Sequence, residues 1–126
     1  ILRIREALNV KKIDMPIHIF GCLDPISILS YFLCGADIFD GTAWLKFSFH
    51  QNTAIYVNNF ALLSRSWGNT DSNVQILMYL LNLKELTHLM HNMRGFAREH
   101  KFEILSFSEG VLKEIMNLTA TAGINY

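Results

Sequence analysis

The sequence lacks an excess of charge of either sign, because Lys and Arg number 11 and Asp and Glu also number 11. A chain without net positive charge does not attract a polynucleotide over its whole surface, so any nucleic-acid site is expected to be a local patch. The sequence also lacks an apolar run of about 18 residues or more, so we expect no membrane span and no membrane partner. No secretory pattern opens it.

Cysteine is scarce. The two present, Cys22 and Cys34, fit a reducing compartment, so we expect free thiols and a cytoplasmic protein. With 126 residues, of which 51% are hydrophobic, the chain is expected to form at most one small domain with a substantial core. It contains no internal repeat and no low-complexity segment.

What the sequence does contain is a strand–helix–strand pattern over residues 16–41. Two short apolar runs flank a helical segment, with strands predicted over 17–20 and 36–39 and the helix over 25–34. Asp24-Pro25 favours a helix start, because Asp is a preferred N-cap and proline fits the first helical position. Gly35 is expected to end the helix in a left-handed conformation. A connection of this length predicts a parallel strand pair with a right-handed crossover.

Asp40 lies directly after the second predicted strand, and Gly21 directly after the first. In parallel βα units the functional groups lie at the carboxyl ends of strands, where loops converge on a ligand. Asp40 is therefore a candidate functional carboxylate. Asp40-Gly41 is also a common turn pair, so a purely structural turn is the alternative.

Helical patterns lie on both sides of this unit. An apolar stripe predicts a helix over 2–12, and apolar residues at spacings of three and four predict a long helix over 72–100. A further helix is predicted over 103–118, with Gly110 weakening its middle. The residues of the long helix expected to face the core are Leu83, Leu86, Leu89, Met90, Met93, Phe96 and Ala97.

The segment between these regions is rich in strand and turn signals. Residues 44–57 predict one or two short strands or a hairpin, since aromatic residues alternate and are followed by a β-rich run. Asn58-Asn59 and residues 68–73 are typical of turns.

Two stretches resemble the tRNA-guanine transglycosylases (queuine tRNA-ribosyltransferases). IHIFGCLDP followed by GADIFDG is similar to that family's Leu-hydrophobic-Gly-x-Gly-x-Pro loop and its Gly-x-Asp-hydrophobic-Phe-Asp segment, at the same separation. Downstream, LLNLKELTHLMHNMRGFAREHKF is similar to the family's late helix. The two matches occur in the right order and span most of residues 16–102.

The resemblance implies an α/β fold, the carboxyl-terminal portion of a (β/α)8 TIM barrel with its last βαβ unit, followed by a helical region. It divides a single partial domain over 1–126 into the barrel end at 1–50, a loop with short strands at 51–73, and carboxyl-terminal helices at 74–126. The chain begins inside a predicted helix, and two parallel strands leave sheet edges unpaired. The remaining part of the barrel is therefore expected on the same chain or on another chain.

The resemblance also implies a base-exchange glycosyltransferase (a pentosyltransferase) that replaces guanine by a 7-deazaguanine. Asp40 matches the nucleophile, which attacks C1′ as guanine leaves and forms a covalent glycosyl intermediate. A carboxylate suits this role because it also stabilises an oxocarbenium-like centre. Phe20 matches the residue that lies against the base, and Gly21 matches the glycine whose backbone approaches it. His18 matches a position beside the nucleophile and can hold Asp40 in place, the alternative being a satisfied core histidine.

Three basic residues are candidates for nucleic-acid contact. Lys46 is six residues after Asp40, where the bacterial enzymes carry the arginine of a Pro-Thr-Arg motif, which AWLK replaces here. Arg94 and Arg98 form a small basic strip with Lys101 on the predicted late helix, and such a strip can meet phosphates. A solvated charge is the alternative for each.

A family zinc site is missing from the sequence. The typical member has a Cys-x-Cys-x-x-Cys cluster before the long helix and a His at its start, which together bind zinc. Here SRSWGNTDSN contains no cysteine, and Leu81 stands where the histidine precedes Asn82. We therefore expect no metal and no other cofactor. Loss of zinc and of Pro-Thr-Arg is reminiscent of divergent relatives that modify DNA, so the expected polynucleotide partner is tRNA or DNA.

Two other functions stay open. One is a non-catalytic nucleic-acid-binding or partner subunit of a transglycosylase-like complex. Retention of Asp40 weighs against it, since a buried carboxylate without a role is costly. The other is an unrelated βαβ domain with helices. In the enzyme hypothesis, the general acid/base and the base-recognising aspartates are expected in earlier strands of the barrel.

Overall fold

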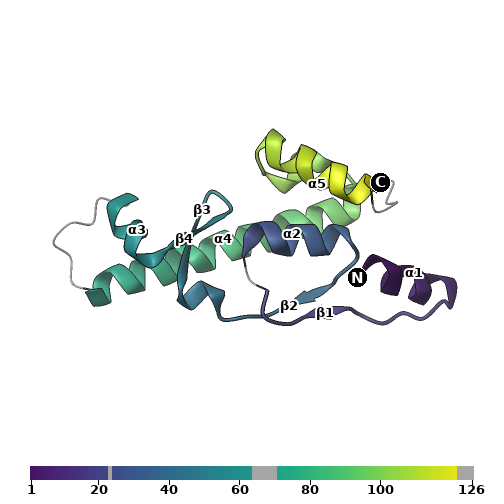
Figure 1. Cartoon of the computed structure of the whole chain (residues 1–126), viewed down its shortest axis with the longest axis horizontal. Helices are drawn as coiled ribbons and strands as arrows, with labels where there is room; N and C mark the ends of the chain where they lie inside the picture. The colour runs from purple at the N-terminus through teal and green to yellow at the C-terminus, as the bar shows by residue number, and fades with distance from the viewer. Residues whose placement is uncertain (23, 64–70, 122–126) are drawn as a thin grey trace.

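The computed structural model describes residues 1–22, 24–63 and 71–121 and shows a mixed α/β chain built along one long helix (Figure 1). The elements in chain order are α1 (Leu2–Val10), β1 (His18–Ile19), α2 (Pro25–Leu33), β2 (Ile38–Phe39), η1 (Ala43–Leu45), β3 (Phe47–His50), β4 (Thr53–Tyr56), α3 (Val57–Leu63), α4 (Asp71–Glu99), η2 (Phe102–Leu105) and α5 (Glu109–Thr121). α2 and α5 lie along the C-terminal half of α4, and the β3–β4 hairpin and α3 lie along its N-terminal half (Figure 1). No helix of the described residues is both long and apolar enough to cross a membrane.

The predicted βαβ unit is confirmed. β1 and β2 pair in parallel, with His18 opposite Ile38 and Ile19 opposite Phe39, so the ladder is shorter than the predicted strands. The Asp24 side chain caps α2 by accepting a hydrogen bond of 3.0 Å from the Ser27 backbone N–H. Gly35 follows α2 with φ +94, as expected for a glycine that ends a helix.

An arginine of the N-terminal helix α1 connects it to the βαβ unit, although the sequence predicted this helix from an apolar stripe. α1 has no buried residue. Arg5 donates to the carbonyl oxygen of Gly35 at 2.9 Å and forms an ion pair with Asp37. A Cβ atom at Gly35 would lie 2.8 Å from the Arg5 Cγ, so glycine at this position also makes room for the arginine.

The predicted hairpin is present, but the asparagine pair after it does not form a turn. β3 and β4 are antiparallel, and Gln51 and Asn52 join them with φ values of +48 and +62. Two consecutive left-handed residues match the twist of a tight hairpin. Asn58-Asn59, predicted as a turn, instead lies within α3, and residues 71–73 of the second predicted turn begin α4. The rest of that turn, 68–70, lies outside the described residues.

The main hydrophobic core joins α2, α4, η2 and α5. Its buried members are Leu29, Leu33, Phe96, Leu105 and Ile115. The helix predicted over 103–118 is wrong as one piece: η2 and α5 are separate, because Ser106 adopts φ +55 between them. Gly110 accordingly lies at the start of α5 and does not interrupt its middle.

The face that α4 buries differs from the predicted stripe. Leu89 and Phe96 are buried as expected, but Leu83, Met90 and Ala97 are exposed. The buried line instead includes two asparagines, and its members are Met78, Asn82, Leu89, Asn92 and Phe96. Residues on both faces of this helix are spaced by three and four. The apolar pattern alone therefore did not distinguish the face that is buried from the one that is exposed.

Three hydrogen bonds explain why a polar residue, Asn82, occupies the core. Its Oδ1 accepts a hydrogen bond of 2.6 Å from the Phe49 N–H. Its Nδ2 donates to the carbonyl oxygens of Trp44 and Phe47, each at 2.7 Å. Asn82 is fully buried, so these three bonds fasten η1 and the first strand of the hairpin to the middle of α4.

Candidate functional site

The carboxyl ends of β1 and β2 bring a carboxylate, a backbone N–H and a histidine ring together. Asp40 Oδ1 accepts a hydrogen bond of 3.2 Å from the Gly21 N–H. Asp40 Oδ2 lies 3.1 Å from His18 Nε2. His18 therefore lies beside Asp40, as the sequence predicted.

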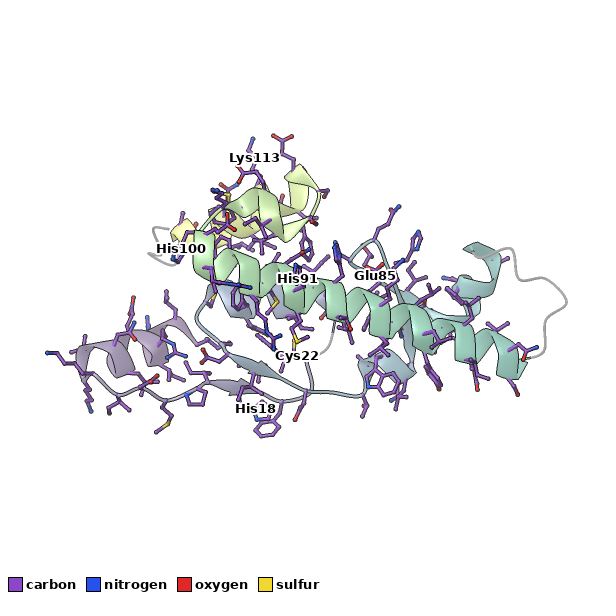
Figure 2. All side chains as sticks on the ribbon, turned by 180° about the vertical axis from the view of Figure 1, so that it is seen from behind. His18, Cys22, Glu85, His91, His100 and Lys113 are labelled. Atoms are coloured by element: carbon purple, nitrogen blue, oxygen red, sulfur yellow. The ribbon has the colours of Figure 1, made fainter. Side chains whose placement is uncertain are left out.

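The parallel ladder explains why these residues meet. His18 pairs with Ile38, so Phe20 and Asp40, each two residues further along, share one face of the strand pair. The rings of His18 and Phe20 lie 4.1 Å apart between centroids. Figure 2 shows His18 on the side of the strand pair that faces away from α4. The cluster of His18, Phe20, Gly21 and Asp40 is called the strand-end site below.

The strand-end site is open in this chain. Phe20 is 77% exposed, and the side chains of Asp40 and His18 are 52% and 33% exposed. The expectation that Asp40 is a buried carboxylate is therefore wrong, and its retention is no argument against a non-catalytic role. An exposed aromatic ring beside a held carboxylate is available to a ligand that has a flat face and an electrophilic atom.

Two glycines allow the loops of the site to approach each other closely. Gly21 has φ +73, a conformation that side chains rarely adopt. A Cβ atom at Gly41 would lie 3.0 Å from the Gly21 carbonyl carbon and 3.2 Å from the Cys22 nitrogen. Gly41 thus lets the loop after β2 lie against the loop after β1.

The opposite end of the strand pair carries a second aspartate, Asp37, which the sequence analysis did not single out. Its Oδ2 accepts a hydrogen bond of 2.8 Å from the Ile17 N–H and also pairs with Arg5. Asp37 and Asp40 therefore clamp the two strands at their two ends by the same kind of bond. The available sequence signal was an aspartate at each end of the apolar pair Ile38-Phe39.

Cys22 lies in the loop of the strand-end site and is half-buried. Burial, and then the neighbouring Asp24 carboxylate, raise the pKa of the Cys22 thiol above its ordinary value of 9.0. Since the thiolate is the nucleophilic form, this environment disfavours Cys22 as the reactive group of the site. Asp40 is the better nucleophile candidate.

We predict that alkylation of Cys22 by iodoacetamide follows an apparent pKa above 9.0 in the folded protein and returns toward 9.0 in urea. The folded state holds the thiol proton more tightly, so its contribution to stability is intact below pH 9.0 and is lost as pH rises through the folded-state pKa. The alkylation rate is measured against pH in a Cys34→Ser variant, in which Cys22 carries the remaining thiol. A folded-state profile at or below the urea profile would contradict the prediction.

The basic residues proposed for nucleic-acid contact do not join the strand-end site. Lys46 is exposed at the end of η1, and Arg94 and Arg98 lie on α4. No hydrogen bond or ion pair links any of the three to the site within the part of the chain that the structure describes. In the same residues, no three His, Cys, Asp or Glu side chains group as a metal site would require.

Comparisons of the chain with protein-family models, with curated proteins and with solved structures find no match. The functional information on this chain therefore comes from the geometry of the strand-end site and from the motif resemblance.

Proposed function

We propose that the chain forms the nucleophile end of a transglycosylase that replaces guanine by a 7-deazaguanine in tRNA or DNA. The observation that carries the proposal is the Asp40 carboxylate at the ends of two parallel strands. It is held by the Gly21 N–H and His18, it is half-exposed, and it lies on one face with an exposed Phe20. The resemblance of IHIFGCLDP and GADIFDG to the tRNA-guanine transglycosylases supports this assignment.

In the first step a carboxylate oxygen of Asp40 forms a bond to C1′ of the nucleotide while the bond from C1′ to guanine N9 breaks. The electron pair of the broken bond leaves on the guanine, which takes up a proton from a general acid. Each oxygen of a carboxylate has two lone pairs, so an oxygen that accepts a hydrogen bond can still attack. The Gly21 N–H and the neighbouring His18 ring orient the carboxylate without blocking its attack.

In the second step N9 of the incoming 7-deazaguanine forms a bond to C1′ and loses its proton to a base. The bond from C1′ to Asp40 breaks, and the carboxylate is restored. Phe20 offers a face on which either purine ring can stack, and the missing side chain of Gly21 leaves room for the base edge. His18 positions Asp40 through the 3.1 Å contact.

A two-stranded parallel ladder leaves a free edge on each strand, which further strands normally cover. We propose that these edges pair with the remaining strands of a (β/α)8 barrel, from the same or another chain. The general acid and the groups that recognise the base belong to those strands. Lys46 is proposed to contact the polynucleotide backbone outside the strand-end site.

One observation favours a second function, a non-catalytic nucleic-acid-binding or partner subunit. Asp37 accepts from the Ile17 N–H as Asp40 accepts from the Gly21 N–H, so both aspartates serve as clamps of the strand pair. In this alternative Asp40 has the same structural role as Asp37 and never bonds to C1′.

The experiment that separates the two functions measures guanine release. The full-length protein is incubated with tRNA or with DNA containing labelled guanine, with and without a 7-deazaguanine, and the products are run on a denaturing gel. We expect a protein–polynucleotide adduct with one of the two polymers, and release of label that the deazaguanine drives to completion. If the protein binds a polynucleotide but forms no adduct and releases no guanine, the enzyme proposal is wrong and the non-catalytic subunit is the better assignment.

A further inference from the structure

A line of apolar side chains on α4 is only partly covered by the residues that the structure describes. Its members, spaced by three and four residues, are Ile76, Leu80, Leu83, Leu86, Met90 and Met93, and we call them the α4 seam. Ile76, Leu80 and Leu83 are each more than half exposed. The line runs for about 25 Å along the helix at 1.5 Å per residue. An exposed apolar line of this length marks an interaction surface.

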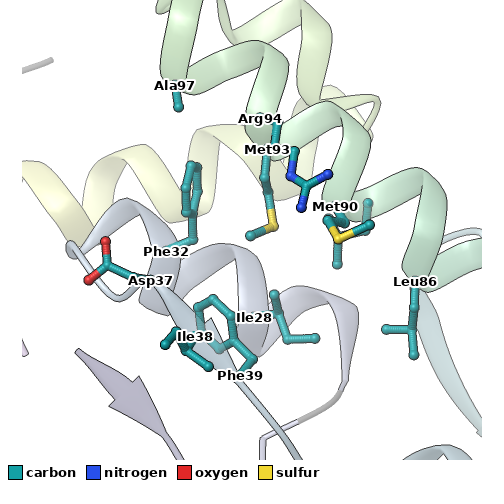
Figure 3. Close-up of a pocket in the computed structure, with 11 residues that line it drawn as sticks. Ile28, Phe32, Asp37, Ile38, Phe39, Leu86, Met90, Met93, Arg94 and Ala97 are labelled. Carbon is teal, nitrogen blue, oxygen red and sulfur yellow. The ribbon is translucent and has the colours of Figure 1, made fainter. Parts of the chain in front are cut away.

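The C-terminal half of the seam forms one wall of a groove. A cavity of about 400 Å³ lies there, and the opposite wall is made by Ile28 and Phe32 of α2 and by Phe39 of β2 (Figure 3). A flat membrane surface cannot reach side chains at the bottom of such a hollow. A small molecule would fill the cavity but would leave Ile76, Leu80 and Leu83 uncovered. A helix laid along α4 covers both parts.

The outer border of the seam is positively charged. Lys84 and Arg94 each lie four residues after a seam member, Leu80 and Met90, and Arg98 lies four residues after Arg94. Figure 3 shows the Arg94 side chain extending beside Met90 and Met93 into the hollow. Its guanidinium has no hydrogen-bond or ion-pair partner among the residues that the structure describes.

The acidic residues of this region do not neutralise that border. By the helical period of α4, Glu85 and Glu99 lie on the other side of the helix, and Glu99 pairs with Lys101. Asp37, the acidic residue in the lining of the groove, is already paired with Arg5. A second copy of α4 would bring a second basic border against the first, which like charges oppose. Carboxylates on the occupant would complement it.

We propose that the α4 seam and its groove bind an amphipathic helix of a partner polypeptide, with apolar residues at coiled-coil spacing and carboxylates along the edge that meets Lys84, Arg94 and Arg98. The apolar residues fill the hollow between α2 and α4, and the carboxylates pair with the cations of the border. This docking surface is separate from the strand-end site and does not depend on base exchange.

The test uses two synthetic helical peptides with leucine at the first and fourth positions of each heptad. One carries glutamate at the flanking positions, and the other carries lysine there. Binding to the full-length protein is measured by fluorescence anisotropy. We expect the glutamate peptide to bind about tenfold tighter than the lysine peptide, and the difference to shrink as salt is added.

Matched variants locate the binding surface. Met90→Asp is expected to weaken the glutamate peptide about tenfold, whereas Met116→Asp on α5 changes nothing, although the two methionines are similarly exposed at 44% and 43%. Arg94→Glu is expected to reverse the preference between the peptides, and Lys113→Glu is its control on α5. All four changed positions are exposed, so the variants should keep the circular dichroism of the parent.

Three further outcomes would overturn the proposal. Equal binding of both peptides, or of neither, would show that the border does not select an acidic helix. Binding to phosphatidylserine vesicles that Met90→Asp abolishes, without peptide selectivity, would assign the seam to a membrane surface. Self-association that Met90→Asp abolishes in sedimentation experiments, again without peptide selectivity, would assign it to a second copy of the chain.

Discussion

Replacing Asp40 by asparagine is expected to abolish the covalent adduct and to reduce base exchange on the order of 10⁴-fold or more, as loss of a catalytic nucleophile does. The amide oxygen of asparagine can still accept the Gly21 N–H bond that Oδ1 accepts now, so the strand ends should stay together. An amide is a poor nucleophile toward C1′, because its electron pairs are delocalised and it carries no charge. The readouts are label release and the adduct band of the denaturing gel.

Asp37 supplies the matched control for this prediction. Asp37→Asn makes the same chemical change at the other end of the same strand pair, where the aspartate accepts from the Ile17 N–H and pairs with Arg5. We expect Asp37→Asn to lower stability modestly and to leave the adduct intact. If both variants lose the adduct equally, or if Asp40→Asn keeps it, Asp40 is a clamp and not the nucleophile.

Replacing Asn82 by leucine is expected to lower the free energy of unfolding by about 3–5 kcal/mol, because each buried group left without a partner costs about 1–3 kcal/mol. The substitution leaves the Phe49 N–H and the carbonyl oxygens of Trp44 and Phe47 without the amide that satisfies them. The better packing of leucine offsets part of the loss. Urea unfolding followed by circular dichroism measures the change.

Two further variants separate hydrogen bonding from shape and from helix composition. Asn82→Asp keeps the volume of the side chain but sets an oxygen toward the carbonyl oxygens of Trp44 and Phe47, so we also expect it to be destabilising. Gln75→Leu makes the same amide-to-leucine change at an exposed position of α4 and should alter stability by no more than about 0.5 kcal/mol. Equal effects of the leucine substitutions at Asn82 and Gln75 would show that the three hydrogen bonds contribute little.

The local chemistry of the sequence determined the βαβ unit and much of its site. Asp24-Pro25 and Gly35 set the ends of α2, because a cap, a missing N–H and a left-handed residue act within one helical turn. The meeting of His18 with Asp40 followed from the same source, since the parallel order of two short strands and their two-residue period place both on one face. The hairpin of β3 and β4 was also predictable from a short segment.

The tertiary structure alone decided which groups are buried and which meet across the chain. Asn82 could not be recognised as a core residue from its neighbours, because its partners in η1 and β3 lie more than thirty residues away. The role of Asp37 became visible only in the structure, where it pairs with Arg5 of the N-terminal helix. Much of the α4 seam was predicted to face the core. An apolar stripe does not indicate whether the same chain or another polypeptide covers it. Burial depends on contacts between distant segments, and a local pattern contains no information on which segments those are.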